Sequence, residues 1–137
     1  MNGAKVYEHA KAHPEDLNPS TVEKALTVTP HMIKNLHDAY AAGVKIAFGT
    51  DTFGMSNHGQ NAQEFAIMVR TGMTPMDAIV AATSNAADLI GDAQDIGSIQ
   101  AGRYADIIAV ASDPLQDITV LEKVQFVMKG GVIYKSK

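Results

Sequence analysis

The stretch VKIAFGTDTFG, residues 44–54, constrains the fold of this chain more than any other feature. Its apolar run ends abruptly in Gly49, Thr50 and Asp51, and a loop containing Gly54 follows. Buried strands of parallel α/β sheets have this continuous apolar character, and barrels present functional side chains where such strands end. The stretch therefore predicts a strand over residues 44–48 that carries the Asp51 carboxylate to the rim of an α/β domain.

The composition excludes several classes of protein. With 137 residues, 46% of them hydrophobic, the chain is long enough for one domain with a core and is not of disordered type. A net charge of −4 with scattered Lys and Arg residues argues against nucleic acid as a partner. There is no membrane-length apolar run and no signal-peptide pattern. The absence of cysteine excludes thiolate metal sites and disulfides, and we expect a cytoplasmic protein.

Helical spacing and turn residues predict an α/β pattern over residues 1–91. Ser20 with Glu23 forms a capping-box pattern, and Thr29 with Pro30 is a second helix start. Gly43 suits a left-handed C-cap directly before the strand. Thr74 and Pro75 begin a further helix, with Asp77 in its first turn. We expect one short helix before Pro14 and others over residues 20–26, 30–42, 61–71 and 75–90.

From Gly97 onward the pattern becomes mainly β. Short β-rich runs are separated by glycines and by Asp113-Pro114. We expect a strand over residues 107–110 and a hairpin of residues 124–128 and 132–134 around Gly130-Gly131. Residues 1–91 thus form an α/β unit, and residues 92–137 form a β-rich tail.

Three residues are candidates for a functional site. Asp51 could ligate a metal ion or accept a proton from metal-bound water; the alternative is a carboxylate that caps the loop or the next helix. His58 could bind substrate, or it could be a solvated loop residue. Glu64 could hydrogen-bond a loop or a substrate amine, although an exposed Glu in a first helical turn needs no function.

The chain also contains two pairs of histidines. His9 and His13 are four residues apart, so a helix would place both on one face, a spacing that can hold zinc. The absence of a Glu after His9 and the helix-disrupting Pro14 favour an ordinary surface helix instead. His31 and His37 are six apart and do not share a face, and we expect both at the surface.

Five strings, taken in order, carry a resemblance to a known family. They are AGVKIAFGTD, NHGQNAQEF, GMTPMDAIVAATSNAADLIG, GSIQAGRYADIIAVASDPLQDI and VQFVMKGGVIYK. Together they resemble the C-terminal part of the metal-dependent amidohydrolase superfamily, in its imidazolonepropionase-like and prolidase-like branch. The resemblance runs from about Ala42 to Lys135 and continues more weakly back to about Asn18.

The resemblance implies a fold and a set of roles. The family fold is a (β/α)8 barrel of the TIM type beside a small β-sandwich built from both chain ends. Asp51 would be the aspartate of the last barrel strand, bound to or beside the metal, and would move the proton from the attacking water to the leaving group. His58 and Glu64 would bind substrate. The complete enzyme would use a divalent metal, zinc being the expected ion, to hydrolyse a small amide or a dipeptide-like substrate, as a peptidase does.

The same resemblance shows what this sequence lacks. The family's other metal ligands are a His-x-His pair, a Lys or Glu and two further histidines, and none has a matching position here. A whole barrel takes about 250 residues. We therefore expect the C-terminal segment of an amidohydrolase, inactive alone and covered by a missing N-terminal barrel portion or by another copy. The alternatives are a stand-alone, non-enzymatic module that self-associates or binds a partner and, less favoured, a small metal-binding protein using His9 and His13.

Overall fold

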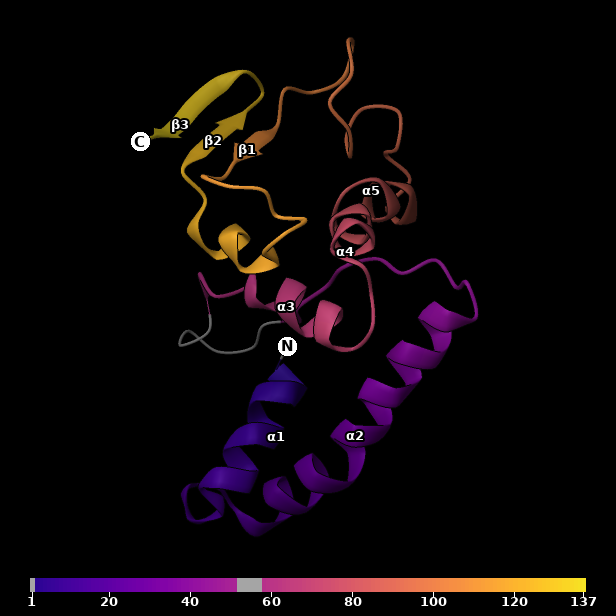
Figure 1. Ribbon diagram of the computed structural model, residues 1–137, viewed down its shortest axis with the longest axis vertical. Helices are drawn as coiled ribbons and strands as arrows, with labels where there is room; N and C mark the ends of the chain where they lie inside the picture. Colours follow the sequence, from indigo (N-terminus) through magenta and orange to yellow (C-terminus); the bar gives the residue numbers. More distant parts are fainter. Residues whose placement is uncertain (1, 52–57) are drawn as a thin grey trace.

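The computed structural model describes residues 2–51 and 58–137 and divides into three parts along its length (Figure 1). A hairpin of α1 (Asn2–Ala12) and α2 (Pro19–Ala41), joined through the 3-10 turn η1 (Pro14–Asp16), projects from one end. Three shorter helices, α3 (Gln63–Arg70), α4 (Pro75–Ala82) and α5 (Ser84–Leu89), form the middle. The other end holds a small sheet of β1 (Ile107–Ala109), β2 (Phe126–Lys129) and β3 (Val132–Ser136), with the 3-10 helix η3 (Ile118–Lys123) packed against α3.

Helix α2 begins two residues earlier than the capping-box pattern predicts. The side chain of Asn18, not that of Ser20, accepts a hydrogen bond from the backbone N–H of Thr21 at 3.0 Å. Pro19 occupies the first turn, where its missing N–H costs nothing. Ser20 instead donates its hydroxyl to Asn18 at 2.8 Å and supports the cap. Asn and Ser are both good N-caps, so neighbouring candidates cannot be separated by propensity alone.

The predicted break between residues 26 and 30 is wrong, because α2 runs through Pro30 as one helix of 23 residues. A proline inside a helix removes one backbone hydrogen bond and typically kinks or breaks the helix. Here Ala25 and Thr29 are buried on the face toward α1, and packing of the two helices offsets the local cost. Tertiary contact has therefore overridden a local stop signal.

The helix predicted over residues 75–90 exists but is divided. Thr74 caps it as expected, accepting a hydrogen bond from the backbone N–H of Asp77 at 3.1 Å. Thr83, with φ −122° and ψ −94°, leaves the helical region and separates α4 from α5. Its hydroxyl donates to the carbonyl of Ile79 at 2.7 Å, a local bond that competes with the helical ladder.

Residues 44–48 belong to no strand in the described part of the chain, which corrects the strand prediction. A strand needs a neighbouring backbone to hydrogen-bond, and here helices supply the partners. The N–H of Phe48 donates to the carbonyl of Ala81 at 2.9 Å, and the side-chain amide of Asn85 donates to the carbonyl of Ile46 at 2.9 Å. The segment is only partly buried: Val44 is exposed, whereas Ile46 and Phe48 pack on a core of Met68, Met73, Ala78 and Ala81.

The predicted strand and hairpin of the tail are present with bounds shifted by one or two residues, and the 3-10 helix η3 between them was not predicted. The three strands pair antiparallel in the order β1-β2-β3. Gly130 and Gly131 turn the hairpin with φ of 55° and 80°, the left-handed values that a type I′ turn requires at both central positions. The carboxylate of Asp106 accepts the N–H of Gly130 at 2.7 Å and ties this turn to the residue before β1. No helix in the described ranges is long and apolar enough to cross a membrane.

Candidate functional site

Asp51 stands where the segment 44–50 ends, and its backbone has an unusual conformation. It is the one non-glycine residue in the described part of the chain with positive φ, at 44°. Aspartate enters this left-handed region at lower cost than most residues because its short polar side chain can bond locally. Such conformations gather at functional sites. The side chain is exposed, as a carboxylate at the rim of a domain should be.

The two ends of the loop after Asp51 lie close together. The predicted loop falls on residues 52–57, which lie outside the described residues, and on residues 58–60. On either side of it, the amide of Asn61 donates to the hydroxyl of Thr50 at 3.0 Å. Asn61 therefore lies beside Thr50, the residue that precedes Asp51.

The three predicted site residues have different surroundings. His58 is exposed, as the alternative of a solvated loop residue expects. Glu64 lies in the first turn of α3 but is only 9% exposed, so the alternative of an exposed helical glutamate is wrong. The ring of Phe65 stacks on Phe48 with centroids 4.7 Å apart, and this contact fixes α3 against the segment that bears Asp51. In the ranges that the structure covers, no three His, Asp or Glu side chains form a group that could hold a metal ion.

A groove of about 950 Å³ separates the α1–α2 hairpin from α3. The ammonium of Lys5 donates to the side-chain carbonyl of Gln60 at 2.6 Å, which joins α1 to the residues that follow the loop. Sequence reasoning missed this contact, because 55 positions separate its partners and no local pattern links them. The groove is lined on the α1 side by Ala4, Lys5, Glu8, His9, Ala12 and His13 and on the α3 side by Gln63, Ala66, Ile67 and Arg70.

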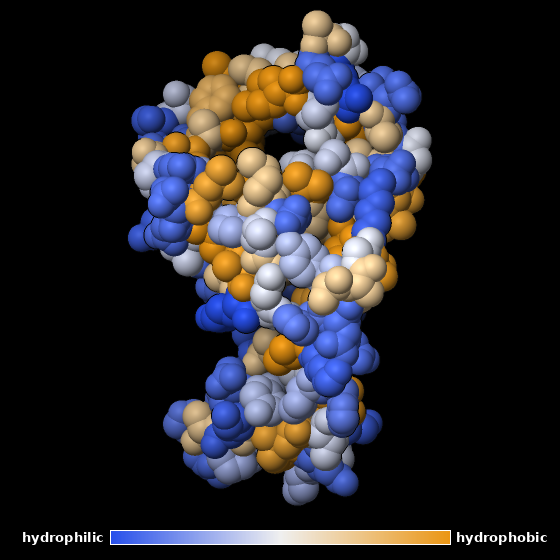
Figure 2. Space-filling view, turned by 45° about the vertical axis from the view of Figure 1, so that its right-hand side comes forward, coloured by the Kyte–Doolittle hydropathy of each residue, from blue (hydrophilic) through white to orange (hydrophobic). Residues whose placement is uncertain are grey.

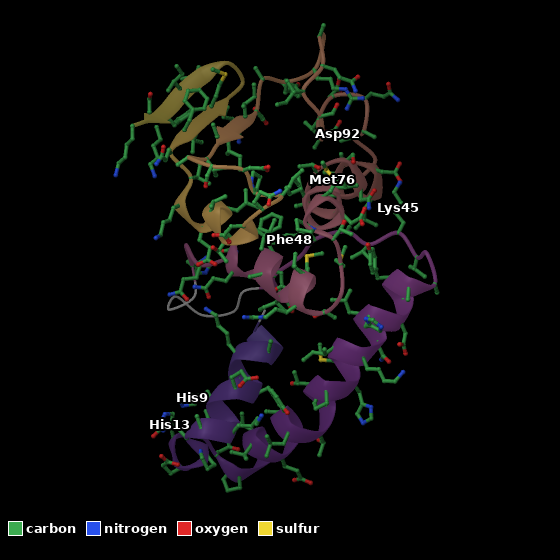
Figure 3. The ribbon with its side chains drawn as sticks, in the orientation of Figure 1. His9, His13, Lys45, Phe48, Met76 and Asp92 are labelled. Carbon is green, nitrogen blue, oxygen red and sulfur yellow. The ribbon has the colours of Figure 1, made fainter. Side chains whose placement is uncertain are left out.

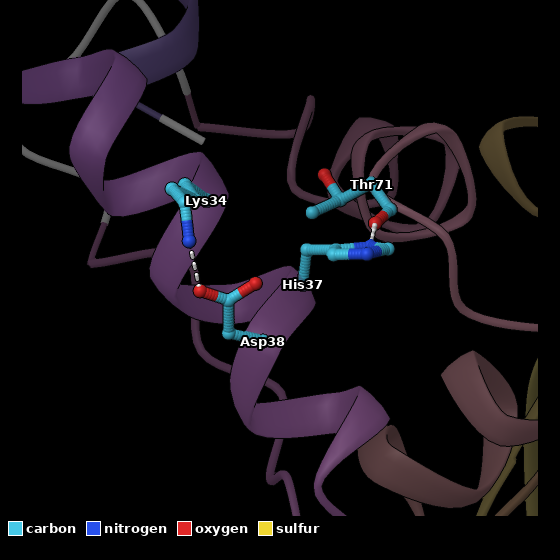
Figure 4. Close-up of polar contacts among 4 residues, drawn as sticks. All are labelled: Lys34, His37, Asp38 and Thr71. Atoms are coloured by element: carbon cyan, nitrogen blue, oxygen red, sulfur yellow. Dashed lines mark hydrogen bonds and ion pairs between the residues drawn. The ribbon is translucent and has the colours of Figure 1, made fainter.

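A second contact joins α2 to the end of α3 (Figure 4). Nδ1 of His37 lies 2.9 Å from the carbonyl oxygen of Thr71, while Lys34 and Asp38 pair beside it along α2. Gly72 follows with φ 113°, and a Cβ there would lie 2.8 Å from the same ring nitrogen. His37 is exposed as predicted, but it also orients the turn between α3 and α4.

Comparison with sequences of known proteins places the chain in a family. The profile of the Amidohydrolase family matches residues 3–134. The ochratoxinase of Aspergillus niger is 42% identical over 108 residues, which cover 75% of this chain and 22% of that protein. The imidazolonepropionase of Shouchella clausii is 36% identical over 101 residues, 67% of this chain and 22% of the enzyme.

Comparison with solved structures indicates the same family. A Xaa-Pro dipeptidase with methionine bound in its active site is 43% identical, with a TM-score of 0.88 over 98% of this chain and 32% of that one. A prolidase complexed with N-methylphosphonate-L-proline has a TM-score of 0.82 at 28% identity, over 96% of this chain and 33% of that one. The matched regions thus span about a fifth to a third of the length of these four relatives. It belongs to the amidohydrolase family and is imidazolonepropionase- and prolidase-like.

Proposed function

We propose that this chain is the C-terminal segment of an amidohydrolase that hydrolyses amide or peptide C–N bonds of small, dipeptide-like substrates. Residues 1–91 would belong to the barrel domain and residues 92–137 to a composite β-sandwich. The likeness to a Xaa-Pro dipeptidase over 98% of the chain supports a C–N bond as the target. The single observation that carries the proposal is the placement of Asp51. This residue is exposed, has a left-handed backbone conformation and follows the segment that packs on the core.

The residues described here do not form a metal centre by themselves. Asp51 offers a carboxylate, but no group of three or more candidate ligands accompanies it in residues 2–51 and 58–137. We therefore place the remaining ligands of a divalent ion, proposed as zinc, in a portion of the complete enzyme outside this chain. When bound, such an ion would lower the pKa of water and so generate the nucleophile.

The role proposed for Asp51 is proton transfer. Its carboxylate would accept a proton from the attacking water and deliver it to the leaving nitrogen, which must be protonated to depart as an amine. Glu64 and His58 would bind substrate from the helix and loop that follow. The Thr50–Asn61 hydrogen bond and the Phe65–Phe48 stack hold these elements beside the Asp51 backbone.

The surface of the chain supports the need for a covering partner. A folded protein of 14.6 kDa has an accessible surface of about 6,900 Å², whereas this chain exposes 9035 Å². The excess of about 2,100 Å² is more than one partner contributes to an ordinary protein interface, about 800 Å². We propose that the rest of the barrel domain covers it, or that a second copy does where that portion is absent.

A chimera tests the catalytic proposal. This chain replaces the matching segment of the Xaa-Pro dipeptidase, and hydrolysis of a Xaa-Pro dipeptide is measured. We expect the chimera to be active, and Asp51→Asn to lower kcat by about a hundredfold or more, since this removes the proton acceptor. Asp38→Asn, an exposed carboxylate on α2, is the matched control and should leave kcat unchanged.

Two results would count against the proposal. Full activity of the Asp51→Asn chimera would exclude the proton-transfer role. A folded but inactive chimera would favour the second candidate, a non-enzymatic module that uses its large apolar surface for self-association or partner binding. The isolated chain should hydrolyse no Xaa-Pro dipeptide in either case.

A further inference from the structure

The C-terminal end of α1 brings two imidazoles together beside two carboxylates. Helix α1 ends at Ala12, yet the N–H of His13 donates to the carbonyl of His9 at 2.7 Å, so the helical turn is completed before Pro14. The two ring centroids are 5.5 Å apart with the planes tilted by 43°. Figure 3 shows both histidines on the same side of α1, next to the turn that leads to α2.

The 5.5 Å separation of the ring centroids is compatible with a shared ion. Imidazole nitrogens bind zinc at about 2.0–2.1 Å, which places the centres of two rings on one ion roughly 5 Å apart. The side chains of His9 and His13 are 45% and 59% exposed and line the open groove, so an ion from solvent can reach them. His13 itself lies just past α1 with a non-helical backbone (φ −141°, ψ 62°), and its N–H bond to the carbonyl of His9 keeps it beside the helix end.

Each imidazole also has a carboxylate neighbour. Nε2 of His9 lies 3.3 Å from Asp16, and Nδ1 of His13 lies 3.5 Å from Glu15. Carboxylates beside metal-binding histidines orient the ring and make its other nitrogen a better ligand. They also supply negative charge that favours a divalent cation. Both carboxylates come from η1, so the turn and the helix end form one cluster.

We propose that His9 and His13 form a surface site for a divalent transition metal ion that prefers imidazole, such as Cu²⁺, Ni²⁺ or Zn²⁺. The ion would take one nitrogen from each ring, and water would fill its other positions, in keeping with the lack of any three-residue metal group in the described ranges. This site is separate from the catalytic role proposed for Asp51 and does not depend on it.

The test is titration of the 137-residue chain with Ni²⁺ at neutral pH. Calorimetry gives the stoichiometry, and paramagnetic broadening of the histidine NMR signals gives the location. We expect one ion per chain and broadening of His9 and His13 before the other histidines. His9→Gln and His13→Gln should each weaken binding by at least about tenfold, because one ligand is lost.

The controls separate this site from others. His31→Gln, on the exposed surface of α2, should bind Ni²⁺ as the unchanged chain does. Circular dichroism verifies that the His9 and His13 variants keep their helix content. Equal Ni²⁺ affinity in the unchanged chain and in the two variants would overturn the proposal. Loss of binding in Asp51→Asn alone would overturn it as well and would move the ion to the proposed catalytic site.

Discussion

Asp77 shows how a single carboxylate can connect parts of the chain that are distant in sequence. It accepts the hydroxyl of Thr74 at 2.5 Å and that of Tyr40 at 2.5 Å. The N–H of Thr74 also donates to the Tyr40 oxygen at 3.4 Å. These bonds connect the end of α2 to the start of α4. These two side-chain hydrogen bonds, first that of Thr74 and then that of Tyr40, lower the pKa of Asp77 below its ordinary 3.8. Desolvation acts in the opposite direction and is the smallest of the three effects.

This cluster predicts a specific acid sensitivity. Because the folded-state pKa is lowered, the stability contributed by Asp77 is complete above 3.8 and is lost as pH falls through the folded value. Thermal unfolding followed from neutral pH to below 3.8 should show a steeper loss for the unchanged chain than for Asp77→Asn. Tyr40→Phe, which removes one of the two side-chain donors, should lie between them.

The comparison isolates Asp77. Asp117 is present in all these proteins, and its pKa is lowered first by the hydroxyl of Thr119 and then by the backbone N–H of Thr119. Its contribution to the loss of stability at low pH is therefore the same in every protein compared. Unfolding midpoints of the unchanged chain and of Asp77→Asn that fall in parallel with pH would contradict the prediction.

At the scale of elements, the loop after α5 is fixed by a close approach to that helix. Gly97 has φ 86°, and a Cβ there would lie 2.6 Å from the Cβ of Ala87 and 3.0 Å from the carbonyl oxygen of Thr83. Gly102 has a similar φ of 89°, but no atom lies within 4 Å of the position of its Cβ. Comparing substitutions at the two glycines therefore distinguishes the free-energy cost of a left-handed backbone, present at both, from the cost of steric crowding, present at Gly97.

Alanine at each glycine tests this. Both variants should lose about 1–2 kcal/mol from the left-handed conformation. Gly97→Ala should lose about 1–3 kcal/mol more, because the loop must move away from α5. Urea denaturation gives both free energies of unfolding. Equal losses would show that the loop does not depend on contact with α5.

At the scale of the whole molecule, the chain exposes more surface than a self-contained protein of its size, and large apolar side chains lie on it. In the described ranges no large side chain is completely buried. Leu89 is 75% exposed, Ile90 68% and Ile99 79%. Figure 2 shows such apolar residues spread between hydrophilic ones over the upper part of the molecule. Large exposed apolar areas mark surfaces that another chain or domain covers.

The isolated chain should therefore self-associate. Light scattering is expected to give an average mass above that of one chain, rising with concentration. Leu89→Lys with Ile90→Lys should shift it toward the monomer, because charge opposes burial of this surface. Ser112→Lys with Gln116→Lys adds the same charge at exposed polar positions and should leave association unchanged. A concentration-independent monomer would contradict the expectation.

Local signals determined much of this protein. The cap at Thr74, the Gly130-Gly131 hairpin and the helix around Glu64 were predictable, because each depends on residues within a few positions. The position of Asp51 at the end of an apolar segment was also visible in the sequence. The five ordered strings were enough to indicate the family to which the chain belongs.

Only the tertiary structure decided the remainder. Helix α2 passes through Pro30 because its packing against α1 outweighs a local stop signal. Glu64 is buried by its neighbours in space, although its sequence position is typical of an exposed residue. Residues 44–48 form no strand because a strand requires the backbone of a neighbouring strand, and in the described ranges the hydrogen bonds to their backbone come from residues of α2, α4 and α5. Pairing, burial and long-range contact depend on what lies nearby after folding, which a local pattern does not contain.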